Sequence, residues 1–472
     1  MHAMKGSQTV GEVFKTRREL LQYGGLGLVG ASLNSLWPLP MKAATTVPKT
    51  RPRGTARNVI FYEISGAISH LDTFDFKDNP ATPKDFQVSK LSNGAYFPVN
   101  FFPRISKIMD KVATVRSLVS HEEVHMRGQY YVQTGRPLNV AFGREIPSLS
   151  SVVASELESQ RRPADTFPTN VSFSLETNQV GALSTGFLPP QFSVFDLNPE
   201  QALKGMALDQ KAIELIEERW RVLKGLRQIN RGRMSGFGRQ IDAFEDFSET
   251  AKRLLTDPRW PVSFQISEED RKRYGNTAPG LGCALARNLL REDAGTRYIH
   301  ICQHGWDHHR RIWDRTTADN HYKLMADFDP ALATLIEDLA VTPSKSSPGK
   351  MLLDETLVVF MSEFGREPGP LNHILGRDHH KYVFPAMFAG AGVKGGLVRG
   401  ASDSDGNRCV DTGWNHKEQP RIENVVATIY SALGIDWGKE VHGTPSGRTY
   451  AYVDPLGANG IIPTDELSVI YG

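Results

Sequence analysis

The chain has 472 residues, of which 40% are hydrophobic, and a formal net charge of +2. This length allows two or three domains, or one large α/β domain with insertions. The near-neutral charge and the lack of a basic patch argue against nucleic acid as a partner. The three cysteines, Cys283, Cys302 and Cys409, show no C-x-x-C spacing. This spacing argues against a zinc ribbon or a disulfide framework and leaves one bridge open.

Residues 1–45 are predicted to be an export signal. Arg17-Arg18 precede a glycine-rich apolar stretch over residues 23–36, and the small residues Ala43-Ala44 follow. This order is typical of a twin-arginine signal peptide. The apolar stretch is short for a bilayer. We therefore expect no stable membrane span after signal removal and a periplasmic or extracellular location. An anchoring N-terminal helix is the alternative.

The rest of the chain is predicted to be a linker (46–57), one α/β domain (58–455) and a C-terminal tail (456–472). Apolar runs of strand length alternate with segments of helical periodicity. Strands are expected over 58–64, 112–118, 167–173, 357–361 and 383–388, with another beginning at Ile299. Helices are expected over 284–290, 321–339 and 421–433. This alternation indicates a mostly parallel central sheet with helices on both faces.

A helical insertion is predicted at about 200–258. Its apolar residues recur at helical spacing, and charged residues fill the other faces. We expect its apolar residues to pack in the core, namely Leu215, Ile216, Trp220 and Leu223.

Three clusters of metal-binding residue types follow predicted strands. In the stretch I-H-I-C-Q-H-G-W-D-H-H, Asp307 and His309 are two residues apart. They point the same way if strand geometry persists. The other clusters are Glu363, and Asp378 with His379 and His380. Solvated polar strand ends are the alternative interpretation.

Together these donors predict a divalent metal site, because carboxyl ends of parallel strands meet at one edge of a sheet. Mixed oxygen and nitrogen donors do not choose among divalent metals. We expect zinc, with manganese, magnesium and calcium as the alternatives. A metal pair held in this way can clamp a phosphate or sulfate ester.

Catalytic candidates follow two other strands. His121 and His125 are four residues apart and would share one face of a helix that ends near Thr134-Gly135-Arg136. The N-terminus of such a helix, aimed at the sheet edge, favours an anion. Asp72 follows the first strand and is the third candidate, with turn formation as its alternative role.

Five motifs in the chain are S-E-F-G-R-x-P, G-R-D-H-H-x-x-x-F-P, A-G-A-G-V-K-G-G, G-W-D-x-H and S-H-L-D-T-F-D. Together they resemble domain-of-unknown-function family 1501, from about Asn58 to about Gly447. That family is placed on the alkaline phosphatase/sulfatase-like scaffold. Its members are typically exported, and few have an assigned reaction. The resemblance implies the same fold for residues 58–455.

The resemblance also implies roles for the metal-binding candidates. Asp307 and His309 resemble the Asp and His of one metal site, with a further histidine from the segment 378–380. Glu363 resembles a ligand of the second metal. The chain departs from the scaffold at Phe364, where a histidine is expected, and its first strand lacks the usual paired aspartates.

The nucleophile is a further departure. Sulfatases carry Cys or Ser nine residues before the Thr of the Thr-Gly-Arg motif, and that place is taken here by His125. Histidine can be a ligand, a base or a nucleophile, but it cannot become the formylglycine of a sulfatase. Ser120 is the alternative nucleophile, with helix capping as its other role.

Two functions follow from these observations. The first is an exported metal-dependent hydrolase or transferase that acts on phosphate or sulfate esters of small molecules or polysaccharides. The second is a catalytically degenerate binding or assembly protein that keeps the fold. The missing second-site ligand and nucleophile favour the second.

Overall fold

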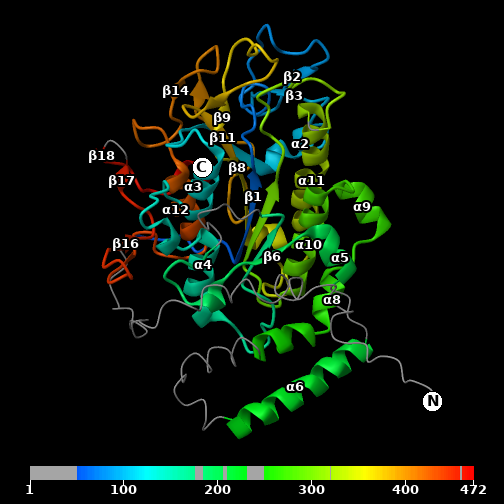
Figure 1. Ribbon diagram of the computed structural model, residues 1–472. Coiled ribbons are helices and arrows are strands. Elements are labelled where there is room, and N and C mark those ends of the chain that lie inside the picture. Colours follow the sequence, from blue (N-terminus) through cyan, green and yellow to red (C-terminus); the bar gives the residue numbers. More distant parts are fainter. Residues whose placement is uncertain (1–49, 176–183, 206–209, 231–248, 319, 458–459) are drawn as a thin grey trace, which may run out of the picture. The chain divides into compact units, whose positions relative to one another are not determined.

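An eight-stranded sheet in the order β12-β4-β11-β8-β1-β7-β5-β6 forms the centre of the domain (Figure 1). β1 (Asn58–Ile64) lies between β7 (Tyr298–Gln303) and β8 (Thr356–Ser362) and is parallel to both. β5 (Asn170–Phe173) and β6 (Phe195–Leu197) extend this parallel part beyond β7. All seven residues of β1 are buried, as expected for a strand covered on both faces.

The other side of the sheet contains its antiparallel strand. β11 (Phe384–Ala389) lies between β8 and β4 (Val112–Leu118) and runs antiparallel to both. β12 (Val398–Arg399) pairs parallel with β4 at the edge. The predicted mostly parallel sheet is confirmed, with β11 as the exception.

This computed structural model describes residues 50–472 apart from 176–183, 206–209, 231–248, 319 and 458–459. The predicted signal at 1–45 and the first part of the linker lie outside the described residues.

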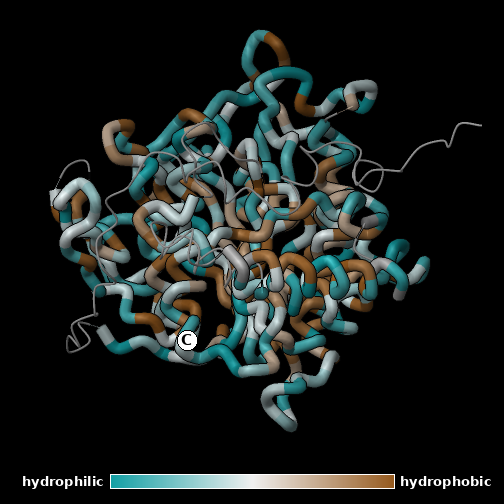
Figure 2. Tube along the Cα trace, turned by 60° about the horizontal axis from the view of Figure 1, so that its bottom comes forward, coloured by the Kyte–Doolittle hydropathy of each residue, from teal (hydrophilic) through white to brown (hydrophobic). Residues whose placement is uncertain are grey.

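Helices cover both faces of the sheet, as predicted (Figure 1). Alternate residues of β1 enter two separate hydrophobic cores, with Ile60, Tyr62 and Ile64 on one side and Val59 and Phe61 on the other. The first core is completed by α2 (Ile105–Ile108), α10 (Ala278–Glu292) and α11 (His321–Val341). The second is completed by α3 (His125–Thr134), α4 (Leu149–Leu157) and α12 (Ile422–Ala432). Figure 2 shows many of the hydrophobic segments in the middle of the trace and many of the hydrophilic ones toward its outside.

The remaining described helices and strands are peripheral to this sheet. They are α5 (Pro199–Gly205), α6 (Gln210–Asn230), α8 (Arg259–Ser263), α9 (Glu268–Tyr274), β2 (Val88–Lys90), β3 (Tyr96–Pro98), β9 (Gly365–Arg366), β10 (His379–His380), β13 (Ala401–Ser402), β14 (Cys409–Asp411), β15 (Glu440–Val441), β16 (Tyr450–Ala451), β17 (Leu456–Gly457) and β18 (Gly460–Ile461).

The predicted helical insertion contains α5 and α6, but the prediction that its four apolar residues pack in the core is wrong, because none of them belongs to either hydrophobic core. Leu215 and Leu223 are exposed, and Ile216 and Trp220 are only half-buried. Helical periodicity records the spacing of apolar residues and not the presence of a surface for them to pack on.

The predicted C-terminal tail contributes to the second core. Leu467 and Ile470 have no exposed surface and pack with residues of α12. The three cysteines are free, and Cys302 is buried, as expected for a core residue. None of the helices in the described part of the chain has the length and apolarity needed to cross a bilayer.

A pH dependence of stability is predicted from Glu423, in the first turn of α12. This carboxyl is buried and accepts a hydrogen bond from the hydroxyl of Tyr131. Burial raises the pKa of Glu423 to about 7. Because folding raises this pKa, the contribution of the group to stability is complete below the unfolded pKa of about 4.3 and is lost as the pH rises through 7.

We therefore expect Glu423→Gln, which stays uncharged, to be stabilising at high pH. Its Tm relative to the wild type should be about 1–3 °C higher at pH 8 than at pH 5. Thermal unfolding followed by circular dichroism at the two pH values measures this difference, and equal shifts at both would contradict the prediction.

Candidate metal centre

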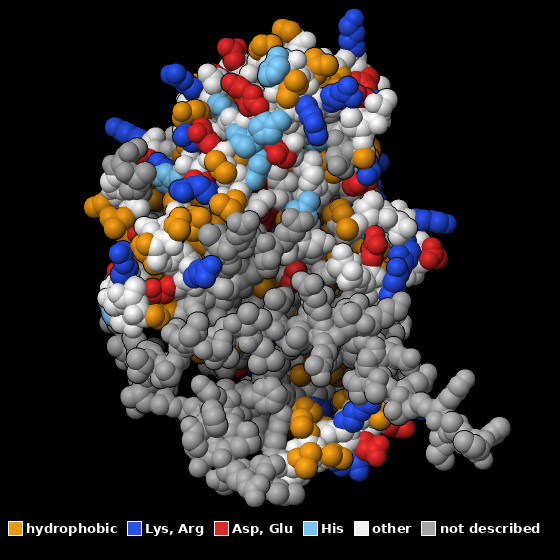
Figure 3. All heavy atoms as spheres, viewed as in Figure 1, with side chains coloured by type: hydrophobic (Ala, Val, Ile, Leu, Met, Phe, Trp, Pro, Cys, Tyr) orange, Lys and Arg blue, Asp and Glu red, His pale blue; other side chains and the backbone are white. Residues whose placement is uncertain are grey.

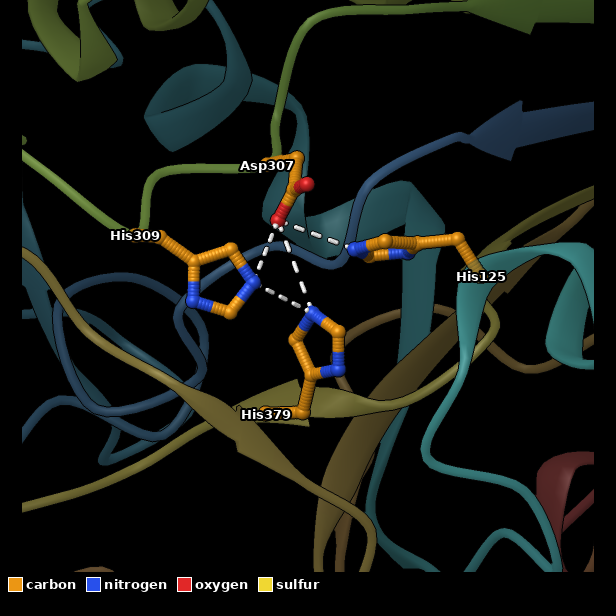
Figure 4. A group of neighbouring side chains, drawn as sticks. All are labelled: His125, Asp307, His309 and His379. Carbon is orange, nitrogen blue, oxygen red and sulfur yellow. Dashed lines mark hydrogen bonds and ion pairs between the residues drawn. The ribbon is translucent and has the colours of Figure 1, made fainter.

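Four side chains from three separate segments of the chain meet beyond the carboxyl ends of β4, β7 and β8. His125, Asp307, His309 and His379 each offer one ligand atom, and these atoms all lie within 4.8 Å of one another (Figure 4). Nε2 of His125 lies 2.9 Å from Oδ1 of Asp307, and Nε2 of His309 lies 3.1 Å from the same oxygen. The Nε2 atoms of His309 and His379 are 2.8 Å apart. Three imidazoles thus face one carboxylate oxygen.

Two glycines allow the loops to come this close. At Gly66, with φ +110°, a Cβ atom would lie 2.6 Å from the backbone nitrogen of Asp307. At Gly128, in α3, a Cβ atom would lie 2.9 Å from Cβ of Glu363. Since any larger side chain would push these segments apart, both positions suit only glycine without a shift of the backbone.

Each imidazole of the group has a hydrogen-bond acceptor at its other nitrogen. The acceptors are Oε1 of Glu363 for His125 (2.7 Å), Oδ1 of Asp378 for His309 (2.6 Å) and the backbone carbonyl of Glu123 for His379. An acceptor at Nδ1 keeps the proton there and leaves the lone pair of Nε2 free for a metal. The three Nε2 lone pairs therefore point toward a common centre, which fits a cation with nitrogen ligands.

Arg366 holds the carboxylate of the group. This buried guanidinium lies 2.6 Å from Oδ1 of Asp307 and also donates to the backbone carbonyls of Gly66 and Ala67. Burial raises the pKa of the Asp307 carboxyl, but hydrogen bonds from His125, His379 and Arg366 outweigh it and hold the pKa well below its usual range. Asp307 is therefore ionised throughout the physiological range and suited to bind a cation.

His125 is the first residue of α3 and contacts two carboxylates. Burial lowers its pKa, but hydrogen bonds to Asp307 and Glu363 outweigh this effect and raise the pKa to about 9. Without a cation, His125 is therefore protonated at neutral pH.

The other predicted metal ligands lie outside the group of four. Glu363 and Asp378 are the acceptors behind His125 and His309, and Glu363 also accepts from the backbone nitrogen of Gly66 at 2.8 Å. His380 follows His379 in β10 but faces away. Its ring stacks on His70 with centroids 5.6 Å apart, and its Nε2 lies 2.9 Å from the carbonyl oxygen of Asn407.

The remaining catalytic candidates have other partners. Asp72 is buried and pairs with Nε of Arg377 at 2.9 Å. Nε2 of His121 lies 2.9 Å from a guanidinium nitrogen of Arg421, and burial together with this charge lowers the pKa of His121 to about 4. Ser120 is buried, and its Oγ accepts from the backbone nitrogen of Glu122 at 3.2 Å. The structure thus brings none of these three residues into the group of four.

Sequence reasoning missed Arg366 and the carbonyl of Glu123. Arg366 lies three residues after Glu363 in the motif S-E-F-G-R, and this short spacing was the indication that the sequence offered. A backbone acceptor such as the Glu123 carbonyl leaves no mark in the residue types.

The fold and this group of side chains define an α/β protein with a candidate metal centre at the carboxyl edge of its sheet. The chain matches the model of the family described as Protein of unknown function (DUF1501) over residues 56–460, and it belongs to this family. This match confirms the resemblance found in the sequence. No curated protein matches the chain.

Solved structures give distant likenesses. One is a protein in the alkaline phosphatase superfamily from Vibrio parahaemolyticus, with 11% identity, 82% of this chain and 69% of that chain covered, and a TM-score of 0.35. Another is the soluble domain of lipooligosaccharide phosphoethanolamine transferase A from Neisseria meningitidis. It has 10% identity and a TM-score of 0.34, with 82% of this chain and 90% of that chain covered. The phosphonate monoester hydrolase from Silicibacter pomeroyi has 10% identity and a TM-score of 0.35, with 80% of this chain and 73% of that chain covered. Likenesses of this degree carry no inference about the reaction.

A pair of adjacent histidines gives a matched test of the centre. His379→Ala removes one of four donors, so we expect its zinc affinity to fall roughly 100-fold or more. His380→Ala removes the neighbouring imidazole, which faces His70, and should keep the affinity of the wild type. Isothermal titration calorimetry with zinc measures both variants, with circular dichroism as the check of folding. Equal affinities for the wild type and His379→Ala would contradict the assignment.

Cation binding should release a proton from His125, because a metal and a proton compete for Nε2. With a pKa of about 9 in the metal-free protein, close to one proton should leave this residue per cation at pH 7. The apparent affinity should then rise about tenfold per pH unit from pH 7 and level off above pH 9. Titrations in buffers of different ionisation enthalpy measure the released protons. A His125→Gln variant that releases as many protons as the wild type would contradict this origin.

Proposed function

We propose that this protein is an exported, metal-dependent hydrolase or transferase that acts on phosphate or sulfate esters. The observation that carries the proposal is the group of three imidazole Nε2 atoms and one carboxylate oxygen within 4.8 Å. Three nitrogen donors and one oxygen favour zinc, with manganese next. Magnesium and calcium prefer oxygen donors throughout. When bound, the cation would supply a Lewis acid for an ester oxygen.

Access to the centre supports a reaction with an external substrate. The side chains of Asp307 and His309 are 45% and 37% exposed. Figure 3 shows histidine side chains gathered at the surface in the upper part of the view, with basic side chains around them. An ester of a small molecule or of a polysaccharide can therefore reach the donors from solvent.

The charge of the centre supports an anionic substrate. Three neutral imidazoles and the Asp307 carboxylate would leave a divalent cation with about one positive charge within its ligand shell. The first turn of α3, which begins at His125, adds backbone N–H groups that favour an anion nearby. Both features would stabilise the charge that develops on a phosphoryl or sulfuryl group.

His125 suits two roles in such a reaction. Glu363 keeps the proton at Nδ1, so Nε2 can serve as the fourth ligand or accept a proton. In the second role, the Glu363 carboxylate would stabilise the imidazolium that forms. As a ligand, His125 would complete a shell of four protein donors, whereas as a base it would leave one place for an ester oxygen.

A second candidate function is a binding or assembly protein without a reaction. Four protein donors complete the tetrahedral shell that is typical of structural zinc sites, whereas catalytic sites keep one place open. The ring of Phe364, which cannot bind a metal, lies 5.1 Å from that of His125. These two features favour a single, closed site.

The amount of bound metal and turnover of generic substrates distinguish the two functions. We expect the purified protein to hold one zinc and to hydrolyse an aryl phosphate or an aryl sulfate. Asp307→Ala should lower turnover about 100-fold or more, and His380→Ala should leave it unchanged. Stoichiometric zinc without any turnover would favour the binding protein. If Asp307→Ala kept both its metal and its turnover, both candidate functions would be contradicted.

Export by the twin-arginine route belongs to the same proposal. It is supported by Arg17-Arg18 and the apolar stretch that follows them. Replacing both arginines with lysine should keep the protein in the cytoplasmic fraction of a bacterial host, and unchanged export would contradict this part.

A further inference from the structure

The loop 372–376 packs against His309 of the candidate metal centre. The side-chain amide of Asn372 donates to the backbone carbonyl of His309 at 2.9 Å and to Oδ1 of Asp378 at 3.3 Å. At Gly376 a Cβ atom would lie 2.0 Å from the carbonyl carbon of His309. These contacts place the loop directly at the edge of the centre, next to one of its four donors.

Three exposed apolar side chains lie on the segments that build the centre. Ile374 and Leu375 belong to the loop and are 44% and 61% exposed. Val124 is 55% exposed and directly precedes His125, and the backbone carbonyl just before it accepts from Nδ1 of His379. We call these three residues the apolar rim. Figure 3 shows hydrophobic side chains at the surface next to the histidines in the upper part of the view.

The backbone holds Leu375 in a conformation that its side chain disfavours. Its φ is +62°, in the left-handed region, which costs free energy for a residue with a Cβ atom. In the facing segment, Arg311 has φ +48°, and its backbone nitrogen donates to the carbonyl of Ile374 at 3.0 Å. Such strain gathers at ligand-binding sites. Because glycine would form the same loop without strain, the leucine side chain itself is indicated to have a role.

The apolar rim lies beside positive charge. Arg310 directly follows His309, pairs with Leu375 in an antiparallel bridge and is exposed. A divalent cation in the centre would add positive charge at the same place. A ligand that matches both features has an anionic group for the centre and an apolar group for the rim.

We propose that the apolar rim binds the apolar alcohol part of the ester whose anionic group binds at the metal centre. The substrates are then phosphate or sulfate esters of apolar alcohols, because the hydroxyl groups of a sugar would gain little from contact with Leu375. This inference rests on the proposed function, since it takes the metal centre as the place of the anionic group.

Binding of alkylphosphonates to the zinc-loaded protein tests the rim without any turnover. These probes carry an anionic group and an alkyl chain but no ester bond. Burial of about half of each methylene corresponds to about a twofold gain in affinity. Hexylphosphonate, with five more methylenes than methylphosphonate, should therefore bind about 30-fold more tightly. Isothermal titration calorimetry measures both affinities, and equal values would overturn the proposal.

A variant of Leu375 tests the contact itself. Leu375→Asn removes the apolar side chain and keeps a residue type that tolerates positive φ. It should weaken hexylphosphonate about fivefold or more and leave methylphosphonate and the Tm unchanged. Equal losses for both probes would overturn the proposal, because they would assign a structural role to Leu375.

Val341→Asn is the matched control. Val341 is 71% exposed and is the last residue of α11, a helix of 21 residues. It therefore lies about 30 Å along this helix from His321, the ring of which packs on Trp306 beside the centre. This variant should keep both affinities of the wild type. A loss as large as that of Leu375→Asn would overturn the assignment to the rim.

The same titrations separate this inference from the proposed reaction. A chain-length gain in a protein that turns over no ester would contradict the reaction and keep the rim. Turnover of an aryl phosphate with equal affinities for the two phosphonates would do the reverse.

Two further results would overturn the rim. One is tight binding of hexylphosphonate by zinc-free protein, because the chain would then bind without the centre. The other is binding of the wild type to vesicles of phosphatidylcholine and phosphatidylglycerol together with equal affinities for the two phosphonates, because it would assign the rim to a membrane surface.

Discussion

The hydrogen bonds of one buried guanidinium join the loops that build the candidate metal centre. Arg366 follows β8 and donates to the backbone carbonyls of Gly66 and Ala67, which follow β1. The same side chain holds the Asp307 carboxylate, which follows β7. A buried arginine needs acceptors for all its N–H groups, so its satisfaction requires these loops to meet. The position of Asp307, and with it the direction of the imidazoles around it, depends on this contact.

The histidines of the centre are oriented by a second layer of acceptors. Two of these are carboxylates, Glu363 and Asp378, which is the residue type that a metal also binds. A carboxylate behind an imidazole makes the ring a better donor and fixes its tautomer. The residues predicted as metal ligands therefore have different places in the structure. Asp307, His309 and His379 face the centre, whereas Glu363 and Asp378 accept hydrogen bonds from the imidazoles.

The fold was predictable from the sequence because the strands are buried on both faces and form continuous apolar runs, as at 58–64 and 357–361. All four members of the group were also named from the sequence, Asp307, His309 and His379 as metal ligands and His125 as a catalytic residue. Their separation from Glu363, Asp378 and His380 was not, because it depends on side-chain direction beyond the strand ends. His379 and His380 point to opposite sides because β10 is extended, which the residues alone do not reveal. The exposure of Leu215 was missed because periodicity does not identify a packing partner.

The contact between Arg366 and Asp307 also determines how the protein should respond to chelators. The guanidinium of Arg366 balances the charge of the Asp307 carboxylate, and each imidazole is held by its own hydrogen-bond acceptor. Contacts within the protein therefore fix the positions of the four side chains. A zinc finger gains its fold from its ion, whereas here the two hydrophobic cores on the central sheet consist of residues other than the four candidate ligands. Removal of the cation by a chelator should then abolish the activity and leave the fold intact.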